Sequence, residues 1–264
     1  MKPLEDRATD ARRPLIIGHR GAARVTPENT IISFKRAMAD GADGIEFDVR
    51  LARDRVPVCI HDSSLRRTAL REGLIASLSS TELVNVDAGT WFNRRFPALA
   101  SEEYTQATIP TLSEVFELFR DTDALLYVEM KCEVSEAGAI ASEVAKLIRE
   151  HEMTERAVVE SFTLEAIIEI KRRAPEIRTA ALFEPKLMPP PSLSRMMRLA
   201  AECRANELAL HHLLARRRVI EEATRRGMKT VVWTVDNPRW LARASRFGIH
   251  AVITNHPAIM RGNG

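Results

Sequence analysis

Eight short apolar segments recur along the chain, and this recurrence limits the folds that the sequence can adopt. Most are near-continuous apolar runs rather than alternating ones, which is typical of parallel strands covered on both faces. The expected strands are Leu15–His19, Gly44–Leu51, Leu125–Met130, Ala157–Phe162, Arg178–Phe183, Glu207–His212, Lys229–Val235 and Ala251–Asn255. Because amphipathic helical stretches separate them, we predict an α/β fold in which strands and helices alternate.

Helix signals lie between these strands. Thr111–Glu114 has the pattern of a capping box, and Asn237–Pro238 is a typical helix start that precedes a stop at Gly248. Eight strand–helix units in 264 residues match the pattern and size of a (β/α)8 TIM barrel. An open, doubly wound sheet is the alternative, but the glycine-rich phosphate loops that would support it are absent. We therefore expect a single barrel domain over residues 1–264.

The longest interval between expected barrel strands runs from Leu51 to Leu125 and predicts an insertion. It begins with a ninth apolar run, Val56–His61, only a few residues after Leu51. A parallel crossover needs about a dozen residues or more, so this run should fold back as an antiparallel hairpin and bring His61 near Glu46. Residues 63–110 then form a polar insertion after the second barrel strand. Loops of that length commonly carry function or cover a site.

The first expected strand ends in a histidine and an arginine, His19 and Arg20, where a loop begins. Barrel enzymes keep their reactive side chains at this end of their strands. The loop leads into a helix for which we predict Thr26 as the N-cap, Pro27 at the first helical position and Gly41 as the stop.

Carboxylates occur at the ends of two neighbouring strands. Glu46 and Asp48 are two residues apart in an apolar strand, so both side chains point to one face. Glu129 lies at the end of the next barrel strand, with Lys131 two residues further on. Three carboxylates in such a place suit Mg²⁺ or Ca²⁺. The alternative is a buried ion-pair network, in which Glu129 pairs with Lys131 and Glu46 with Arg20.

Two histidines favour a catalytic metal site over a buried ion-pair network, because His19 and His61 both fall at expected strand ends near the carboxylates. Histidines act as general acid and general base near neutral pH. Arg20 and Lys131 add positive charge that suits a phosphate group. A metal ion, an acid, a base and an anion clamp together are the groups that phosphodiester cleavage requires.

Nine segments follow one another in a characteristic order along the chain: His19–Gly21, Pro27–Thr30, Gly41–Val49, His61–Asp62, Pro110–Glu114, Glu129–Lys131, Ser161–Phe162, Trp233–Val235 and Ile253–Asn255. In this ordered set the chain resembles the glycerophosphodiester phosphodiesterase family, from about residue 15 to 257. The resemblance implies a TIM barrel with an insertion after the second strand and its hairpin. It also implies hydrolysis of glycerophosphodiesters, such as glycerophosphocholine or glycerophosphoethanolamine, to glycerol 3-phosphate and an alcohol.

The resemblance also implies roles for single residues. It assigns metal binding to Glu46, Asp48 and Glu129, acid–base catalysis to His19 and His61, and substrate binding to Arg20, Lys131 and Trp233. The family is similar to phosphatidylinositol-specific phospholipases C, in which a hydroxyl of the substrate attacks phosphorus and a cyclic phosphate forms. By that likeness one histidine would deprotonate the glycerol 2-hydroxyl and the other would protonate the leaving alcohol. The sequence leaves open which histidine has which role.

The chain departs from the family pattern at two positions. The hairpin turn carries Arg55 in place of the usual glycine, which is better suited to positive φ. The last strand ends in Asn255 in place of the usual aspartate, so one negative charge is missing at the barrel mouth.

Two other functions remain open. One is a lysophospholipase D that acts on single-chain lysophospholipids with the same catalytic residues; Trp91, Phe92 and Phe96 would then roof an acyl groove, unless they form a core of the insertion. The other is an inactive barrel that binds phosphodiesters or a protein partner. Such inactive barrels usually lack a metal ligand or a catalytic histidine. Here the three predicted metal ligands and the two predicted histidines are all present.

Charge and cysteine content narrow the partners and the compartment. The net charge of +3 is too balanced to favour nucleic acid or an anionic membrane. Three distant cysteines give neither a disulfide framework nor a metal-binding spacing. The polar start of the chain, residues 1–14, has no apolar core like that of a signal peptide. We expect a cytoplasmic protein with a small-molecule substrate and no stable membrane anchor; a homodimer is compatible with the sequence.

Overall fold

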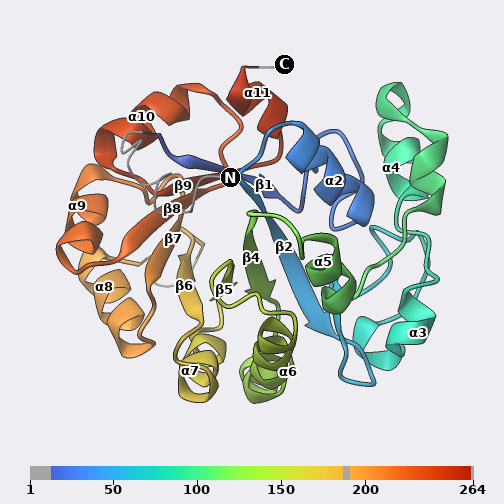
Figure 1. The fold of residues 1–264 in the computed structure, drawn as a ribbon, viewed down its shortest axis with the longest axis horizontal. Coiled ribbons are helices and arrows are strands. Elements are labelled where there is room, and N and C mark those ends of the chain that lie inside the picture. The colour runs from blue at the N-terminus through green and yellow to red at the C-terminus, as the bar shows by residue number, and fades with distance from the viewer. Residues whose placement is uncertain (1–12, 187–190, 263–264) are drawn as a thin grey trace.

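The computed structural model describes residues 13–186 and 191–262. Its centre is a closed barrel of eight parallel strands, which Figure 1 shows surrounded by helices. The barrel strands are β1 (Leu15–His19), β2 (Gly44–Leu51), β4 (Leu125–Met130), β5 (Ala157–Ser161), β6 (Arg178–Phe183), β7 (Glu207–His211), β8 (Lys229–Trp233) and β9 (Ala251–Thr254). Pairing of β1 with both β2 and β9 closes the barrel. The predicted (β/α)8 fold is confirmed, with four strands ending one or two residues earlier than expected.

Helices follow the barrel strands and pack around them. They are α2 (Ile31–Ala39), α5 (Leu112–Leu118), α6 (Ala137–Glu150), α7 (Leu164–Arg173), α8 (Leu193–Glu202), α9 (Arg217–Arg225), α10 (Arg239–Phe247) and α11 (Pro257–Arg261). A short 3-10 turn, η4 (Val134–Glu136), precedes α6. Among the described residues, no helix is long and apolar enough to cross a membrane. The polar residues 1–12, on which part of the compartment prediction depends, lie outside the described residues.

Alternate residues of each strand enter two separate cores. Ile16 and Val128 pack in the large core between the strands and the surrounding helices. Ile17 and Tyr127 belong to a second cluster built from strand residues, which fills the barrel interior. This period of two explains why the strands are apolar throughout, because both of their faces are buried.

The predicted hairpin is present. Strand β3 (Pro57–Cys59) runs antiparallel to β2, with Val49 paired to Cys59. In the turn between them, Arg55 adopts a left-handed backbone conformation with φ of 67°. The hairpin therefore forms with a residue that is less suited to this conformation than the glycine usual in the family.

The expected start of the first helix is wrong. Helix α2 begins four residues later than Pro27, with Thr30 as the N-cap accepting a hydrogen bond from the Ser33 N–H. The cause is Asn29, whose φ of 57° lies in the left-handed region and interrupts a right-handed helix. Thr26 instead donates its hydroxyl proton within the loop, to the carbonyl of Ala22 and the hydroxyl of Ser33.

The insertion has more structure than its polar sequence suggests. Residues 63–110 contain the short helical elements η1 (Ile75–Ser77), α3 (Ser80–Leu83), α4 (Thr90–Arg95), η2 (Pro97–Leu99) and η3 (Glu102–Gln106). Its buried apolar residues, including Leu65, Leu83 and Ile109, form a cluster with Val58 of the hairpin. In Figure 1, α3 and α4 lie at one side of the barrel, beyond α2 and α5.

Aromatic side chains of the insertion pack with one another. Phe92 is fully buried, and the rings of Trp91, Phe96 and Tyr104 surround it with centroid distances of 5.7, 4.9 and 5.7 Å. Of the two readings given above, this packing favours a core of the insertion over the roof of an acyl groove.

Candidate active site

Register between neighbouring strands brings the predicted site residues together. His19 on β1 pairs with Glu46 on β2, and Asp48 on β2 pairs with Glu129 on β4. His19 and Glu129 lie at or next to the carboxyl ends of β1 and β4, and the longer β2 carries Glu46 and Asp48 level with them. Because side chains alternate along a strand, the three acidic side chains point toward the barrel interior. Tyr127, two residues before Glu129, points to the same interior.

The three carboxylates form one compact cluster. Glu46, Asp48 and Glu129 are all buried, and each offers an oxygen atom that lies within 4.8 Å of the others. Lys131 Nζ lies 2.6 Å from Glu129 Oε1 and 3.2 Å from Asp48 Oδ1. Arg20 Nε lies 3.1 Å from Asp48 Oδ2. The Glu129–Lys131 pair of the alternative prediction is therefore present. Glu46 accepts the backbone N–H of Arg20 at 3.1 Å, and no ion pair between Glu46 and that guanidinium is found among the described residues.

Charge is unevenly compensated within this cluster. Burial, together with repulsion from Asp48 and Glu129, holds the pKa of Glu46 well above its usual range. Burial likewise raises the pKa of Glu129 to about 7, against the opposing effect of Lys131. Burial alone would also raise the pKa of Asp48, but Arg20 and Lys131 together lower it well below its usual value. Two side-chain cations do not suffice to keep three carboxylates ionised.

A divalent cation would compensate the negative charge that Arg20 and Lys131 leave unbalanced. The donor set is three carboxylates, which is the oxygen-rich chemistry that Mg²⁺ and Ca²⁺ prefer. Binding of a cation would stabilise the ionised forms of Glu46 and Glu129, which burial now opposes.

Asn29 orients one member of the cluster. Its Nδ2 donates to Asp48 Oδ2 at 2.8 Å, and its Oδ1 accepts from the Asp48 backbone N–H at 3.2 Å. The left-handed backbone of Asn29 makes this pair of contacts available. Asn29 lies in one of the segments that carry the resemblance, but local patterns in the sequence predict no role for it.

His19 is held by a chain of hydrogen bonds that passes through the side-chain amide of Asn255. Asn255 donates from Nδ2 to Asp236 Oδ2 at 2.8 Å, so its Oδ1 faces His19 Nδ1 at 2.7 Å. Since an amide oxygen only accepts, the proton of the neutral imidazole resides on Nδ1. The other nitrogen, Nε2, carries a lone pair and lies 3.8 Å from Glu46 Oε2. Burial and the nearby Arg20 lower the pKa of His19 to about 4, so the ring is neutral at physiological pH.

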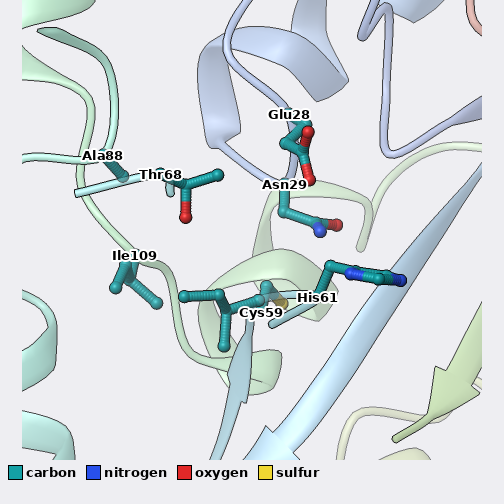
Figure 2. A pocket seen from close by; sticks show the side chains of 8 residues that line it. Glu28, Asn29, Cys59, His61, Thr68, Ala88 and Ile109 are labelled. Carbon is teal, nitrogen blue, oxygen red and sulfur yellow. The ribbon is translucent and has the colours of Figure 1, made fainter. Parts of the chain in front are cut away.

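His61 is held by a carboxylate instead. Its Nδ1 donates to Asp62 Oδ1 at 2.6 Å, and its backbone carbonyl accepts from Arg50 Nε at 2.8 Å. The side chain is 33% exposed, against 20% for His19. Burial lowers the pKa of His61, while Asp48 and Asp62 act in the opposite direction. His61 also lines a small cavity, together with Thr68 of the insertion and Asn29 of the loop after β1, as Figure 2 shows.

Aromatic rings continue from the charged cluster to the far side of the mouth. The Trp233 ring packs edge-on against Phe162 and His211, with centroids 5.5 and 5.1 Å apart. Lys131 Nζ lies 5.6 Å from the centroid of the Phe162 ring. Trp233 is thus connected to the phosphate-binding candidate Lys131 through one ring, at the end of β8.

Five polar residues of this network were not assigned roles by the sequence: Glu28, Asn29, Asp62, Arg67 and Asp236. Asp62 could have been found, because it directly follows His61 in the chain. Arg67 and Asp236 carry no local pattern, since their partners lie on other loops.

The fold and the site define a TIM-barrel enzyme with an acidic centre at the carboxyl ends of its strands. The chain belongs to the glycerophosphoryl diester phosphodiesterase family, whose model matches residues 19–259. The predicted family, and an enzyme of this kind, are thereby confirmed.

Relatives and solved structures agree with this membership. The chain is 34% identical to the glycerophosphodiester phosphodiesterase of Caldanaerobacter subterraneus, over 93% of this chain and 95% of the relative. It is 28% identical to a Bacillus subtilis glycerophosphodiester phosphodiesterase, over 93% and 84% of the two chains. It is also similar to an Oleispira antarctica phosphodiesterase solved with its product sn-glycerol-3-phosphate, with a TM-score of 0.83, 26% identity and coverage of 96% and 98%. These comparisons do not favour the lysophospholipase D alternative.

Proposed function

We propose that this protein is a metal-dependent phosphodiesterase that hydrolyses glycerophosphodiesters, such as glycerophosphocholine or glycerophosphoethanolamine, to glycerol 3-phosphate and an alcohol. The observation that carries the proposal is a buried cluster of three carboxylates next to two histidines with differently charged partners. The family membership and a product complex in a similar structure support the substrate class.

Glu46, Asp48 and Glu129 would hold one divalent cation, Mg²⁺ or Ca²⁺. When bound, the cation supplies positive charge that acidifies a nearby hydroxyl group and stabilises negative charge on the phosphate. Asn29 fixes the carboxylate of Asp48 in a single orientation, as partners of metal ligands commonly do.

His19 would act as the general base. The neutral ring directs its unprotonated Nε2 toward the carboxylate cluster, while Nδ1–H is fixed by Asn255. In this position Nε2 would accept the proton of the glycerol 2-hydroxyl, whose oxygen then attacks phosphorus.

His61 would act as the general acid. Its partner Asp62 carries a negative charge that favours the imidazolium form, and the ring is more exposed than that of His19. As the bond from phosphorus to the headgroup oxygen breaks, Nε2–H would protonate the leaving alcohol. The cyclic phosphate of glycerol that remains would be opened by water with the two histidines in reversed roles, which yields glycerol 3-phosphate.

Arg20, Lys131 and Trp233 would bind the substrate. Arg20 and Lys131 lie beside the carboxylate cluster and would attract the phosphodiester anion. Trp233 presents a ring at the mouth, next to Phe162, against which an apolar part of the substrate would pack.

The test is release of glycerol 3-phosphate from glycerophosphocholine, first with EDTA and then with Mg²⁺ or Ca²⁺ restored. We expect activity that depends on the added cation and that falls on the order of 10³-fold in His19→Ala. His151→Ala is the matched control, because His151 hydrogen-bonds Ser113 on the outside of the barrel, away from the site. Folded protein that releases no product with either metal would refute the proposed reaction.

We further infer a reducing compartment such as the cytoplasm. Cys59, Cys132 and Cys203 are all free, and two of them are buried. Homodimer formation stays a prediction from the sequence.

A further inference from the structure

We propose that Arg67, a residue of the insertion, is a positioning residue that holds His61 in its catalytic orientation. The inference rests on the function proposed above and gives the insertion a part in that reaction. Arg67 lies in the loop that follows the hairpin, outside the carboxylate cluster, and its side chain is 42% exposed. Its action on the reaction would pass through other residues.

The first contact of Arg67 reaches the histidine through one carboxylate. Arg67 Nε donates to Asp62 Oδ2 at 2.6 Å, and the other oxygen of Asp62 accepts from His61 Nδ1 at 2.6 Å. Burial acts against ionisation of Asp62, but the hydrogen bonds from Arg67 and His61 lower its pKa to about 2. The carboxylate is therefore charged at all working pH values, and its orientation fixes that of the imidazole.

The second contact anchors the guanidinium to the barrel. Arg67 Nη1 and Nη2 donate to the two oxygens of Glu28, both at 2.8 Å, which is a bidentate pair. Glu28 Oε1 also accepts from Arg20 Nη1 at 2.7 Å. Because Arg20 and Arg67 both bind Glu28, the Glu28 carboxylate is fixed in place. It in turn fixes the Arg67 guanidinium that binds Asp62.

The backbone of Arg67 is fixed by the core of the insertion. Leu65 is fully buried in the apolar cluster of the insertion, and its N–H donates to the Gly73 carbonyl at 3.0 Å. Thr68 is 6% exposed, and the Arg67 guanidinium lies 5.9 Å from the centroid of the Trp91 ring. The insertion therefore delivers one planar cation to a defined place beside His61.

The geometry requires arginine rather than another cation. Three nitrogen atoms of one planar group bind three carboxylate oxygens on two loops, and a lysine ammonium cannot match this fork. Loss of the hydrogen bonds from Arg67 would leave the Asp62 carboxylate free to rotate. His61 would then lose its fixed hydrogen-bond acceptor. The step that needs a proton from His61 is departure of the alcohol, so the effect should depend on the leaving group.

The experiment compares two substrates at saturating concentration. Glycerophosphocholine has an alcohol leaving group that needs a proton, whereas the p-nitrophenyl ester of glycerol 3-phosphate releases a phenolate that does not. We expect Arg67→Met to lower kcat on glycerophosphocholine by about 10- to 100-fold. The first-turnover release of p-nitrophenol from the second ester, which precedes opening of the cyclic phosphate, should stay nearly unchanged. Arg67→Lys should recover only part of the loss. Arg66→Met is the matched control, because Arg66 pairs with the exposed Glu72 of the insertion, and it should change neither rate.

A second readout does not require activity. Nitrogen-15 NMR of His61, assigned with His61→Ala, reports whether Nδ1 carries a fixed proton. We expect this signature in the wild type and in Arg66→Met, and its loss in Arg67→Met. If the wild type were inactive but the NMR results were as expected, the proposed function would be refuted and the positioning role of Arg67 would be retained. If Arg67→Met kept the NMR signature of the wild type, the role of Arg67 would be overturned. An equal slowing of the first turnover on both substrates would overturn it as well.

Discussion

The two sides of the barrel mouth hold their histidines by different means. On one side, His19 ends β1 and contacts Asn255, an amide that is in turn fixed by Asp236 on the loop after β8. On the other side, His61 follows the hairpin and contacts Asp62, a carboxylate fixed by Arg67 of the insertion. The His19 side belongs to the barrel itself, while the His61 side holds the more exposed of the two rings and depends on an added segment.

This difference suits the opposite roles that we propose for the two histidines. The less exposed histidine, next to an arginine and an amide, stays neutral and could accept a proton. A more exposed histidine with a carboxylate partner is better able to carry the proton that it donates. The usual aspartate of the family at position 255 would make the two sides more alike, so Asn255 increases the contrast in this chain.

The largest expected effect is loss of His19. A base is needed whichever alcohol leaves, so His19→Ala should lower kcat on both glycerophosphocholine and the p-nitrophenyl ester, on the order of 10³-fold. Steady-state kinetics at saturating metal would show this. Retention of activity on either ester would mean that another group removes the proton from the substrate.

Loss of His61 should have a smaller and more selective effect. In His61→Ala, kcat on glycerophosphocholine should fall by about 10²-fold, because the leaving alcohol receives no proton. The p-nitrophenyl ester should lose far less in the formation of the cyclic phosphate, which release of p-nitrophenol reports directly. If both esters suffered equally, the assignment of acid and base to the two sides would be wrong.

Asn255→Asp should make the two sides alike and shift the pH dependence. A carboxylate next to Nδ1 stabilises the imidazolium, so the pKa of His19 would rise from about 4. A base is active only when unprotonated, and activity is therefore lost as the pH falls through that pKa. The acidic limb of the kcat/KM profile should move upward by about one pH unit, with a greater loss of activity at pH 5 than at pH 8. Asn237→Asp, on the nearby loop, serves as a charge-matched control.

The smallest expected effect concerns the hairpin that delivers His61. Arg55→Gly removes a side chain from a left-handed position and should raise the free energy of unfolding by about 0.5 kcal/mol, without changing kcat. Urea denaturation would measure it. The exposed Arg55–Glu143 ion pair is lost in this variant, so Glu143→Gln serves as the control that isolates the contribution of the backbone.

Local patterns were sufficient to predict the barrel and the place of its chemistry. The apolar runs gave the eight strands, and the short link after Leu51 gave the antiparallel hairpin, because few residues cannot form a parallel crossover. The spacing of Glu46 and Asp48 placed both carboxylates on one face. These features depend on chain periodicity and connection length, which are properties of neighbouring residues.

Local patterns failed where a loop residue has a distant partner. Thr26 and Pro27 looked like a helix start, but Asn29 adopts a left-handed conformation from which its side chain binds Asp48. The insertion reads as a polar segment without a periodicity of its own, but its scattered apolar residues pack against the hairpin. In both cases contacts across the fold outweigh the local preference of the chain.

The sequence by itself determined the architecture, the strand that carries each acidic residue and the family to which the chain belongs. The tertiary structure alone decided which atoms face one another: the amide of Asn255 toward His19, and the fork of Arg67 between Asp62 and Glu28. The reason is physical. Strand faces follow from a fixed period along the chain, whereas hydrogen-bond partners on separate loops depend on distances and directions that only the closed barrel sets.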